Sequence, residues 1–337
     1  MAPVKVASVQ AASVAYDLHA SVAKLLPLVK EAAQAGARLA VFPEAYLGAY
    51  PRHLDFKIGA RTDENREWFS RYVKAAVKIP DGAEGVAWLS ANEEDIGEDG
   101  DFWAFQQLCK AARDNKINLS VGIIERSLVG ATLWCSNVLI SDGGVLLSKH
   151  RKLQPTAAER IVWSQGHVTN EPGLPNSGLA HTDNLAVAPT SIGKIGGLIC
   201  WENFMPLARY ALYQKGVEIY TAPTADGRPT WTPLLQSIAQ EGRCFVVSAN
   251  QYHGTTDFPS DYPANISRAG GAKEDVWCRG GSSIVDPLGN ILAGPLWDKE
   301  GILYADIDID TIIGAKLDFD PVGHYARSDI LSLQIKQ

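Results

Sequence analysis

The stretch from residue 194 to residue 203, KIGGLICWEN, decides the fold of this chain. It reads as a short apolar strand that ends at Cys200, and a helical pattern begins at about Phe204. A thiol at such a junction can face a pocket with backbone N–H groups beside it, which favour a thiolate and stabilise an anion next to the sulfur. A buried structural cysteine is an equally good interpretation, because free cysteines are among the most buried residues.

Two further strand-like runs end in charged side chains. In residues 37–44, ARLAVFPE, an apolar strand is followed by Pro43 and Glu44, and residues 145–156, VLLSKHRKLQPT, place a basic cluster after a strand. The carboxyl ends of strands form the ligand crevice of open α/β sheets. A thiol, a carboxylate and an ammonium group together supply a nucleophile, a base and an electrostatic stabiliser.

These charged residues also have simpler interpretations. Glu44 could be a surface carboxylate, although a proline before it in an apolar run disfavours that. The basic cluster from Lys149 to Lys152 could be solvated, since charge runs usually are. The residues alone do not distinguish these two lysines.

The chain resembles the nitrilase superfamily over nearly its whole length. The FPE run at 42–44, the HRKLQPT run at 150–156, the CWEN run at 200–203 and the VGHYAR run at 322–327 occur in the order of that family. Each motif alone is only moderately specific, and their combination in the correct order is a strong signal.

The neighbourhood of Cys200 is similar to the nitrilase branch, of plant and fungal type, more than to the amidase or carbamoylase branches. The CWEN form, the following MPLARY run at 205–210 and the IYTAPTAD run at 219–226 carry this likeness. It implies hydrolysis of organic nitriles to carboxylic acids and ammonia, through a thioimidate and a thioester, with some amide as by-product. Arylacetonitriles or functionalised aliphatic nitriles are the favoured substrates. An amidase or carbamoylase, and a catalytically silent binding or scaffold protein, are the alternatives.

The resemblance implies a catalytic triad of Glu44, Lys152 and Cys200. The family pattern of a lysine shortly before Pro-Thr selects Lys152 within the basic cluster. Glu159 resembles a second glutamate that many members place beside the lysine; otherwise it is a helix-surface charge. We expect Glu44 to transfer protons and Lys152 to stabilise the charge of the tetrahedral intermediate, aided by the backbone N–H after the cysteine. No metal ion or organic cofactor is implied.

Aromatic residues near these motifs are candidates for the substrate pocket. Tyr46 and Tyr50 follow the glutamate, Trp163 follows the lysine segment, and Trp201 adjoins the cysteine. Aromatic walls with few polar groups suit a neutral nitrile, and Thr224 is a further candidate for the lining. Core packing is the alternative for each aromatic residue.

The order of the predicted elements indicates an α/β fold with an internal repeat. A helix, Gly36 and a strand are matched by a helix, Gly216 and a strand, and a hairpin at 136–148 is matched by one at 282–293. This repeat weakly favours two sheets packed face to face. The resemblance implies a four-layer α-β-β-α sandwich with two mixed sheets. No linker-like stretch divides the chain, so we expect one domain over residues 1–337.

Composition argues against several kinds of partner. The 337 residues carry a net charge of -7 without a basic stripe, which disfavours nucleic acid. No apolar run of membrane length and no secretory leader pattern is present, so no membrane partner is expected. Five cysteines without CxxC spacing suit a reducing, cytoplasmic location, and none of the seven histidines has metal-ligand spacing.

Self-association is a further expectation from the resemblance. It implies a homodimer that extends to a higher oligomer or a helical filament, as a heterologous contact that does not close would produce. Candidate contact regions are residues 52–64, residues 252–280 and the tail near His324.

Overall fold

The computed structural model describes residues 3–54, 56, 60–92, 94, 96–167, 184–267 and 275–335. The elements follow one another in the order β1 (Val4–Gln10), α1 (Leu18–Gln34), β2 (Ala37–Val41), α2 (Asp63–Lys74), α3 (Trp88–Ala91), α4 (Trp103–Asn115), β3 (Asn118–Arg126), β4 (Leu133–Ile140), β5 (Leu146–Arg151), η1 (Ala157–Ile161), β6 (Ala188–Thr190), β7 (Gly193–Gly197), η2 (Cys200–Phe204), α5 (Pro206–Gln214), β8 (Ile219–Thr221), α6 (Trp231–Gly242), β9 (Phe245–Ser248), β10 (Tyr252–Gly254), η3 (Thr255–Asp257), α7 (Pro263–Ser267), β11 (Val276–Val285), β12 (Ile291–Trp297), β13 (Gly301–Ile307) and α8 (Thr311–Ala315).

The strands form two mixed sheets. The first has the order β13-β1-β2-β3-β4-β5, in which β1, β2 and β3 are parallel. The second has the order β10-β11-β9-β8-β7-β6 with β12 paired to β11, and β7, β8 and β9 are parallel. Each sheet therefore combines three parallel strands with a hairpin, β4–β5 or β11–β12, as the predicted repeat requires.

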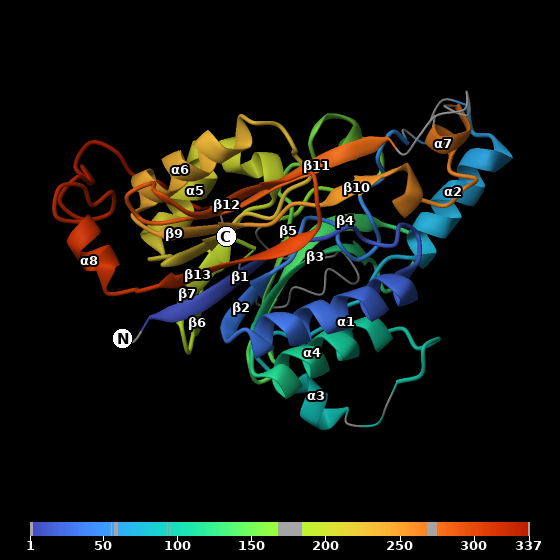
Figure 1. The fold of residues 1–337 in the computed structure, drawn as a ribbon, viewed down its shortest axis with the longest axis horizontal. Coiled ribbons are helices and arrows are strands. Elements are labelled where there is room, and N and C mark those ends of the chain that lie inside the picture. Colours follow the sequence, from blue (N-terminus) through green and yellow to red (C-terminus); the bar gives the residue numbers. More distant parts are fainter. Residues whose placement is uncertain are drawn as a thin grey trace.

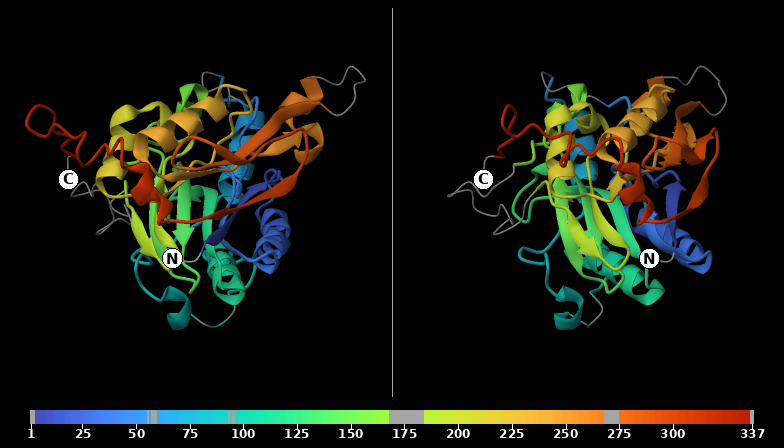
Figure 2. Two further views of the ribbon diagram at one scale, coloured as in Figure 1. Left: turned by 60° about the vertical axis from the view of Figure 1, so that its left-hand side comes forward. Right: turned by 90° about the vertical axis from the view of Figure 1, so that its left-hand side faces the viewer.

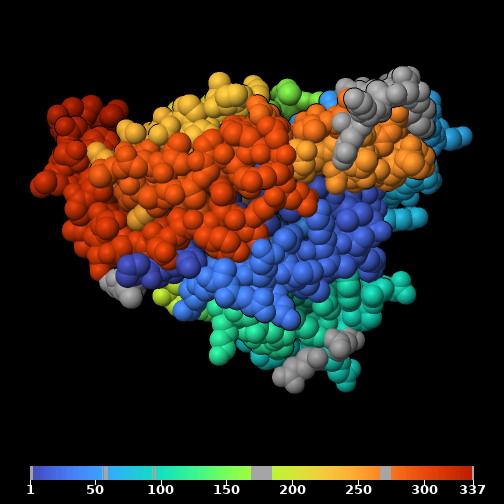
Figure 3. Space-filling model, in the orientation of Figure 1, coloured from blue at the N-terminus to red at the C-terminus, as the bar shows by residue number. Residues whose placement is uncertain are grey.

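Helices cover the outer face of each sheet. Helices α1 and α4 lie on one side of the paired sheets, and α5 and α6 lie on the other (Figures 1 and 2). The predicted four-layer α-β-β-α sandwich is confirmed. Strand β13 closes the first sheet by pairing antiparallel with β1, so the C-terminal strands pack along the N-terminal segment on the surface (Figure 3).

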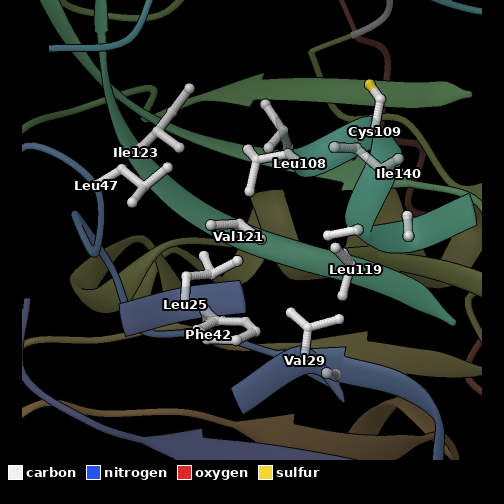
Figure 4. Close-up of a cluster of buried hydrophobic side chains, with 14 of the residues drawn as sticks. Leu25, Val29, Phe42, Leu47, Leu108, Cys109, Leu119, Val121, Ile123 and Ile140 are labelled. Carbon is white, nitrogen blue, oxygen red and sulfur yellow. The ribbon is translucent and has the colours of Figure 1, made fainter. Parts of the chain in front are cut away.

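Apolar side chains fill all three spaces between the layers. Leu25 and Val29 of α1 form one cluster with Leu119 and Val121 of β3 (Figure 4). Residues of both sheets, among them Leu39 and Ile219, form the core between the sheets, and α5 and α6 bury a third cluster against β8 and β9. Removal of this surface from water is the main force that holds the layers together.

The sequence predicts loops over residues 83–100, 164–184 and 252–280, and the structure corrects the first and the last. Residues 83–100 contain the short helix α3, and residues 252–280 contain β10, α7 and the first half of β11. Gly280 and Gly281 have φ values of 88° and 112°, and the pairing of β11 with β12 shifts register beside them. Glycines at such a bulge read as a turn in the sequence, so the strand was predicted to begin only at residue 282. Most of the loop predicted over residues 164–184 lies outside the described residues.

No helix in the described ranges is both long enough and apolar enough to cross a bilayer.

A buried ion cluster links β3 to β5, the edge strand of the first sheet. Glu125 of β3 is 2% exposed and accepts hydrogen bonds from Lys149 (2.8 Å) and Arg151 (2.6 Å) of β5. Burial opposes the charge of Glu125, but the two cations outweigh it and hold the pKa of this carboxyl well below its usual range. The cluster therefore contributes stability above the ordinary glutamate pKa of 4.5, and this contribution is lost as the pH falls below that value.

We predict that Glu125→Ala lowers the free energy of unfolding by about 3–5 kcal/mol at pH 7, because it leaves buried cations without their carboxylate. Urea unfolding measures this, and the difference from wild type should shrink below pH 4.5. Asp329→Asn, in the exposed pair of Arg327 with Asp329, is the control. An equal shift of the unfolding midpoint in both variants would contradict the prediction.

Candidate active site

Glu44 lies just beyond the carboxyl end of β2 and is fully buried. The chain here crosses directly over β3 at Gly122, where an added Cβ would lie 2.1 Å from the carbonyl oxygen of Pro43. Only glycine permits this approach. The side-chain amide of Gln251 donates to the carbonyl oxygen of Glu44 at 2.9 Å, so the second sheet also holds this segment in place.

Cys200 lies three residues beyond β7, at the start of η2, and is 4% exposed. Its backbone has a φ of 52°, in the left-handed region that residues other than glycine rarely adopt. The N–H of Cys200 donates to the carbonyl oxygen of Pro223 at 2.8 Å, and the hydroxyl of Thr224 donates to the sulfur at 3.1 Å. The strained residue is thus held by the segment that follows β8.

Lys152 joins two carboxylates in one buried group. Its Nζ lies 2.7 Å from Oε1 of Glu44 and 2.7 Å from Oε2 of Glu159, and the lysine is 0% exposed. Glu159 is fixed in turn by the hydroxyl of Tyr50 at 2.8 Å and the backbone N–H of Thr156 at 2.6 Å. The structure therefore brings the predicted carboxylates and ammonium together, and the thiol lies next to them.

The basic cluster that includes Lys152 is buried rather than solvated. Lys149 pairs with Glu125, whereas His150 binds Glu202 at 2.9 Å. The surface interpretation of this cluster is wrong because each of its cations has an acidic partner inside the fold. Lys149 and Lys152 are also distinguished, since only the latter contacts Glu44.

Burial, reinforced by Glu44, keeps the Cys200 thiol protonated. Burial raises the pKa of the Cys200 thiol well above its usual range and Glu44 adds to the effect, while Lys152 opposes it. Burial also raises the pKa of Glu44, against the attraction of Lys152. For Lys152 burial is outweighed by Glu44, Cys200 and Glu159, and its pKa is well above its usual value. The thiolate expected from the sequence is therefore not the resting form, and the thiol needs a base.

A cavity of about 570 Å³ opens above the thiol, a size typical of small-molecule sites. It is lined by Tyr50, Arg52, Thr156, Ala157, Ala158, Glu159, Cys200, Trp201, Ala225, Asp226, Gly227, Arg228, Val276, Trp277, Cys278 and Arg279. In the described ranges, no group of three or more His, Cys, Asp or Glu residues could hold a metal ion.

The predicted pocket residues occupy different places. Tyr50 and Trp201 line the cavity, and Thr224 contacts the sulfur from the side. Trp163 packs behind the lysine, 5.6 Å from its Nζ, and is 3% exposed. Tyr46 is wrong as a lining residue, because it is fully buried in the cluster beneath α1 and α4, next to Phe42.

Several residues that shape the candidate active site could not be predicted from the sequence. Gly122 clears the path of the glutamate segment, and the thiol of Cys135 lies 3.6 Å from Oε1 of Glu44. Glu202 accepts hydrogen bonds from the N–H groups of Leu153 and Ile199 and also binds His150. A glycine within an otherwise apolar strand was the one available signal, because it marks a close backbone approach.

A buried thiol, two carboxylates and a lysine thus converge at one end of a sandwich of two sheets. A model of the carbon-nitrogen hydrolase family matches residues 5–316. The chain belongs to this family. The three residues of the predicted triad lie well within the matched range.

Similar members of the family include proteins named as nitrilases. An aliphatic nitrilase of Sinorhizobium fredii is 42% identical over 100% of this chain and 97% of its own length. A bifunctional nitrilase/nitrile hydratase of Lupinus angustifolius is 42% identical, over 99% of this chain and 86% of its own. An arylacetonitrilase of Trametes versicolor is 39% identical over 99% and 97%.

Solved structures of more distant proteins share the fold. A carbon-nitrogen hydrolase from Helicobacter pylori has a TM-score of 0.66 at 19% identity, and covers 97% of this chain and 96% of its own. Nit3 of Saccharomyces cerevisiae, a member of the nitrilase superfamily, has a TM-score of 0.65 at 19% identity over 96% and 97%.

We predict that Cys200 carries no thiolate at pH 7, because its pKa is raised above the ordinary thiol value of 9.0. The difference in absorbance at about 240 nm between wild type and Cys200→Ser, which reports thiolate, should stay near zero from pH 6 to 8. A step in that difference below pH 7.5 would refute the prediction.

Proposed function

We propose that the protein hydrolyses organic nitriles to carboxylic acids and ammonia through a covalent intermediate on Cys200. The observation that carries this proposal is the placement of the thiol on the wall of the cavity, with Glu44, Lys152 and Glu159 buried beside it. Nitrilase relatives that align over the whole chain favour nitriles within the family.

Glu44 acts first as a base. It takes the thiol proton as sulfur adds to the nitrile carbon, and then delivers that proton to the nitrogen, which gives a thioimidate. Its Oε2 is suited to this exchange, because it is buried and has no hydrogen-bond partner among the described residues. Lys152 keeps its proton and stabilises charge near the reacting carbon, together with the backbone N–H of Trp201.

Water completes the reaction in two additions. Glu44 removes a proton from the first water as it adds to the thioimidate carbon, and passes that proton to the nitrogen. The proton of the new hydroxyl group then follows through Glu44 to the nitrogen as the C–N bond breaks, so ammonia leaves and a thioester remains. The second water adds in the same way and releases the carboxylic acid and the Cys200 thiol. If sulfur leaves in place of ammonia, the product is the amide, and we propose that some amide forms by this route.

The described walls favour arylacetonitriles or functionalised aliphatic nitriles as substrates. The rings of Trp201 and Trp277 line the cavity, and so do three arginines and an aspartate that is paired with one of them. An amidase or carbamoylase that uses the same Glu44, Lys152 and Cys200 is the second candidate, since the same group can hydrolyse an amide.

We predict rapid ammonia release from nitriles by wild type, slower release from the matching amides, and a loss of about 10³-fold or more with Cys200→Ala, because no nucleophile remains. A panel of paired nitriles and amides, with chromatography to separate acid from amide, measures this. Cys109→Ala, which removes a buried thiol of α4 far from the triad in sequence, is the control. Release from amides alone would place the protein with amidases, and an active Cys200→Ala would contradict the mechanism.

We also propose that the chain forms a homodimer that extends to a higher oligomer or filament. Support comes from apolar side chains left on the surface, such as Leu207 at 68% exposure and Leu317 at 87%. Light scattering and negative-stain microscopy at several protein concentrations test this, and a monomer at all of them would contradict it.

We further infer a single domain over residues 1–337 and a cytoplasmic location. Both sheets share one core, which supports the first inference, and the five cysteines are free and buried, which suits a reducing compartment. Limited proteolysis that released a stable fragment would contradict the single domain. Fractionation of the source cells tests the location, and recovery of the protein outside the cytoplasm would contradict it.

A further inference from the structure

Three arginines line the cavity that contains the thiol: Arg52, Arg228 and Arg279. Two of them already have carboxylate partners. Arg228 binds Asp226 through two nitrogens, and Arg279 binds Asp298 in the same manner, at 3.1 and 2.6 Å.

Arg52 has no such partner among the described residues. Its guanidinium makes one hydrogen bond, from Nη2 to the carbonyl oxygen of Ala225 at 2.6 Å. Its Nε is buried and bonds to none of the described groups. A guanidinium carries five N–H donors, so most of the donors of this partly buried side chain remain unused.

The side chain of Arg52 is nevertheless held in place. Its guanidinium carbon lies 4.6 Å from the centre of the Tyr50 ring, and the hydroxyl of Tyr262 donates to its backbone oxygen at 2.7 Å. An arginine that is fixed before a ligand arrives loses little conformational freedom on binding it. Arg52 is therefore suited to bind an anion, unlike a solvated surface arginine, whose side chain is free to move.

The position of Arg52 relative to Cys200 suits a short ligand. Its guanidinium binds Ala225, and the neighbouring Thr224 contacts the sulfur of Cys200. Arg52 and Cys200 therefore contact adjacent residues and line the same cavity, so that one small molecule can contact both of them.

The geometry points to Arg52 as a specificity residue that binds the carboxylate of a short aliphatic nitrile whose cyano carbon lies against Cys200. This inference rests on the proposed nitrile hydrolysis and narrows its substrate class to nitriles that carry a carboxylate. The planar guanidinium can donate two parallel hydrogen bonds to that carboxylate, which a neutral chain of equal shape cannot accept.

The test compares 4-cyanobutanoate with 5-methylhexanenitrile, in which an isopropyl group replaces the carboxylate. The kcat/KM of wild type should be higher for 4-cyanobutanoate than for 5-methylhexanenitrile. Arg52→Gln should lower this preference by about 10- to 100-fold, as expected for the loss of a charged hydrogen-bond pair, and Arg52→Lys should retain part of it. Arg279→Gln is the matched control, since it removes a cavity cation that already has a carboxylate partner.

The inference would be overturned if the ratio of kcat/KM for 4-cyanobutanoate to that for 5-methylhexanenitrile were one or less in wild type. It would also be overturned if Arg52→Gln and Arg279→Gln lowered this ratio equally. Either result would leave nitrile hydrolysis itself standing. Calorimetric binding of 4-cyanobutanoate to Cys200→Ala, with and without Arg52→Gln, separates recognition from chemistry. Binding that depends on Arg52 supports the inference even if no nitrile is hydrolysed, and absence of binding overturns it. Thermal unfolding of each variant confirms that it is folded.

Discussion

The attraction between Lys152 and the two carboxylates of Glu44 and Glu159 is the interaction on which the rest of the site depends. All three groups are buried, where an unpaired charge is very costly and a missing partner strongly destabilises the others. Burial of the neighbouring thiol, reinforced by Glu44, keeps that thiol protonated. Proton transfer within the group, rather than a preformed thiolate, is the chemistry that this arrangement favours.

A second buried network connects this group to the nucleophile. Glu202 of η2 accepts hydrogen bonds from Ile199 in its own segment and from Leu153, directly after the lysine. It also binds His150 of β5, and so it ties the second sheet to the first. The relative position of lysine and thiol therefore depends on a carboxylate that contacts neither, because buried polar networks of this kind hold a single arrangement.

The site residues that lie in recognisable motifs could be predicted from the sequence, whereas those whose role depends on tertiary packing could not. Glu44, Lys152, Glu159 and Cys200 follow or flank strand ends, and their convergence follows from the parallel strands of each sheet. The direction of Tyr46 could not be predicted, because it depends on how the chain turns beyond β2. Choosing between the lysines without the family likeness required knowledge of Glu125, which is far away in the sequence. The sandwich itself was suggested by the repeat, but short elements such as α3 give too little periodicity to detect.

The close crossing at Gly122 has a consequence for how this pocket can diversify. The segment that carries Glu44 packs with its backbone directly against the backbone of β3, and even one methyl group at Gly122 would displace it. Much of the lining of the cavity instead comes from residues 225–228 and 276–279, where side chains such as Trp277 and Arg279 face the space. New substrate ranges, in nature or in the laboratory, should therefore arise by changes in that part of the lining, while the segment of Glu44 stays invariant.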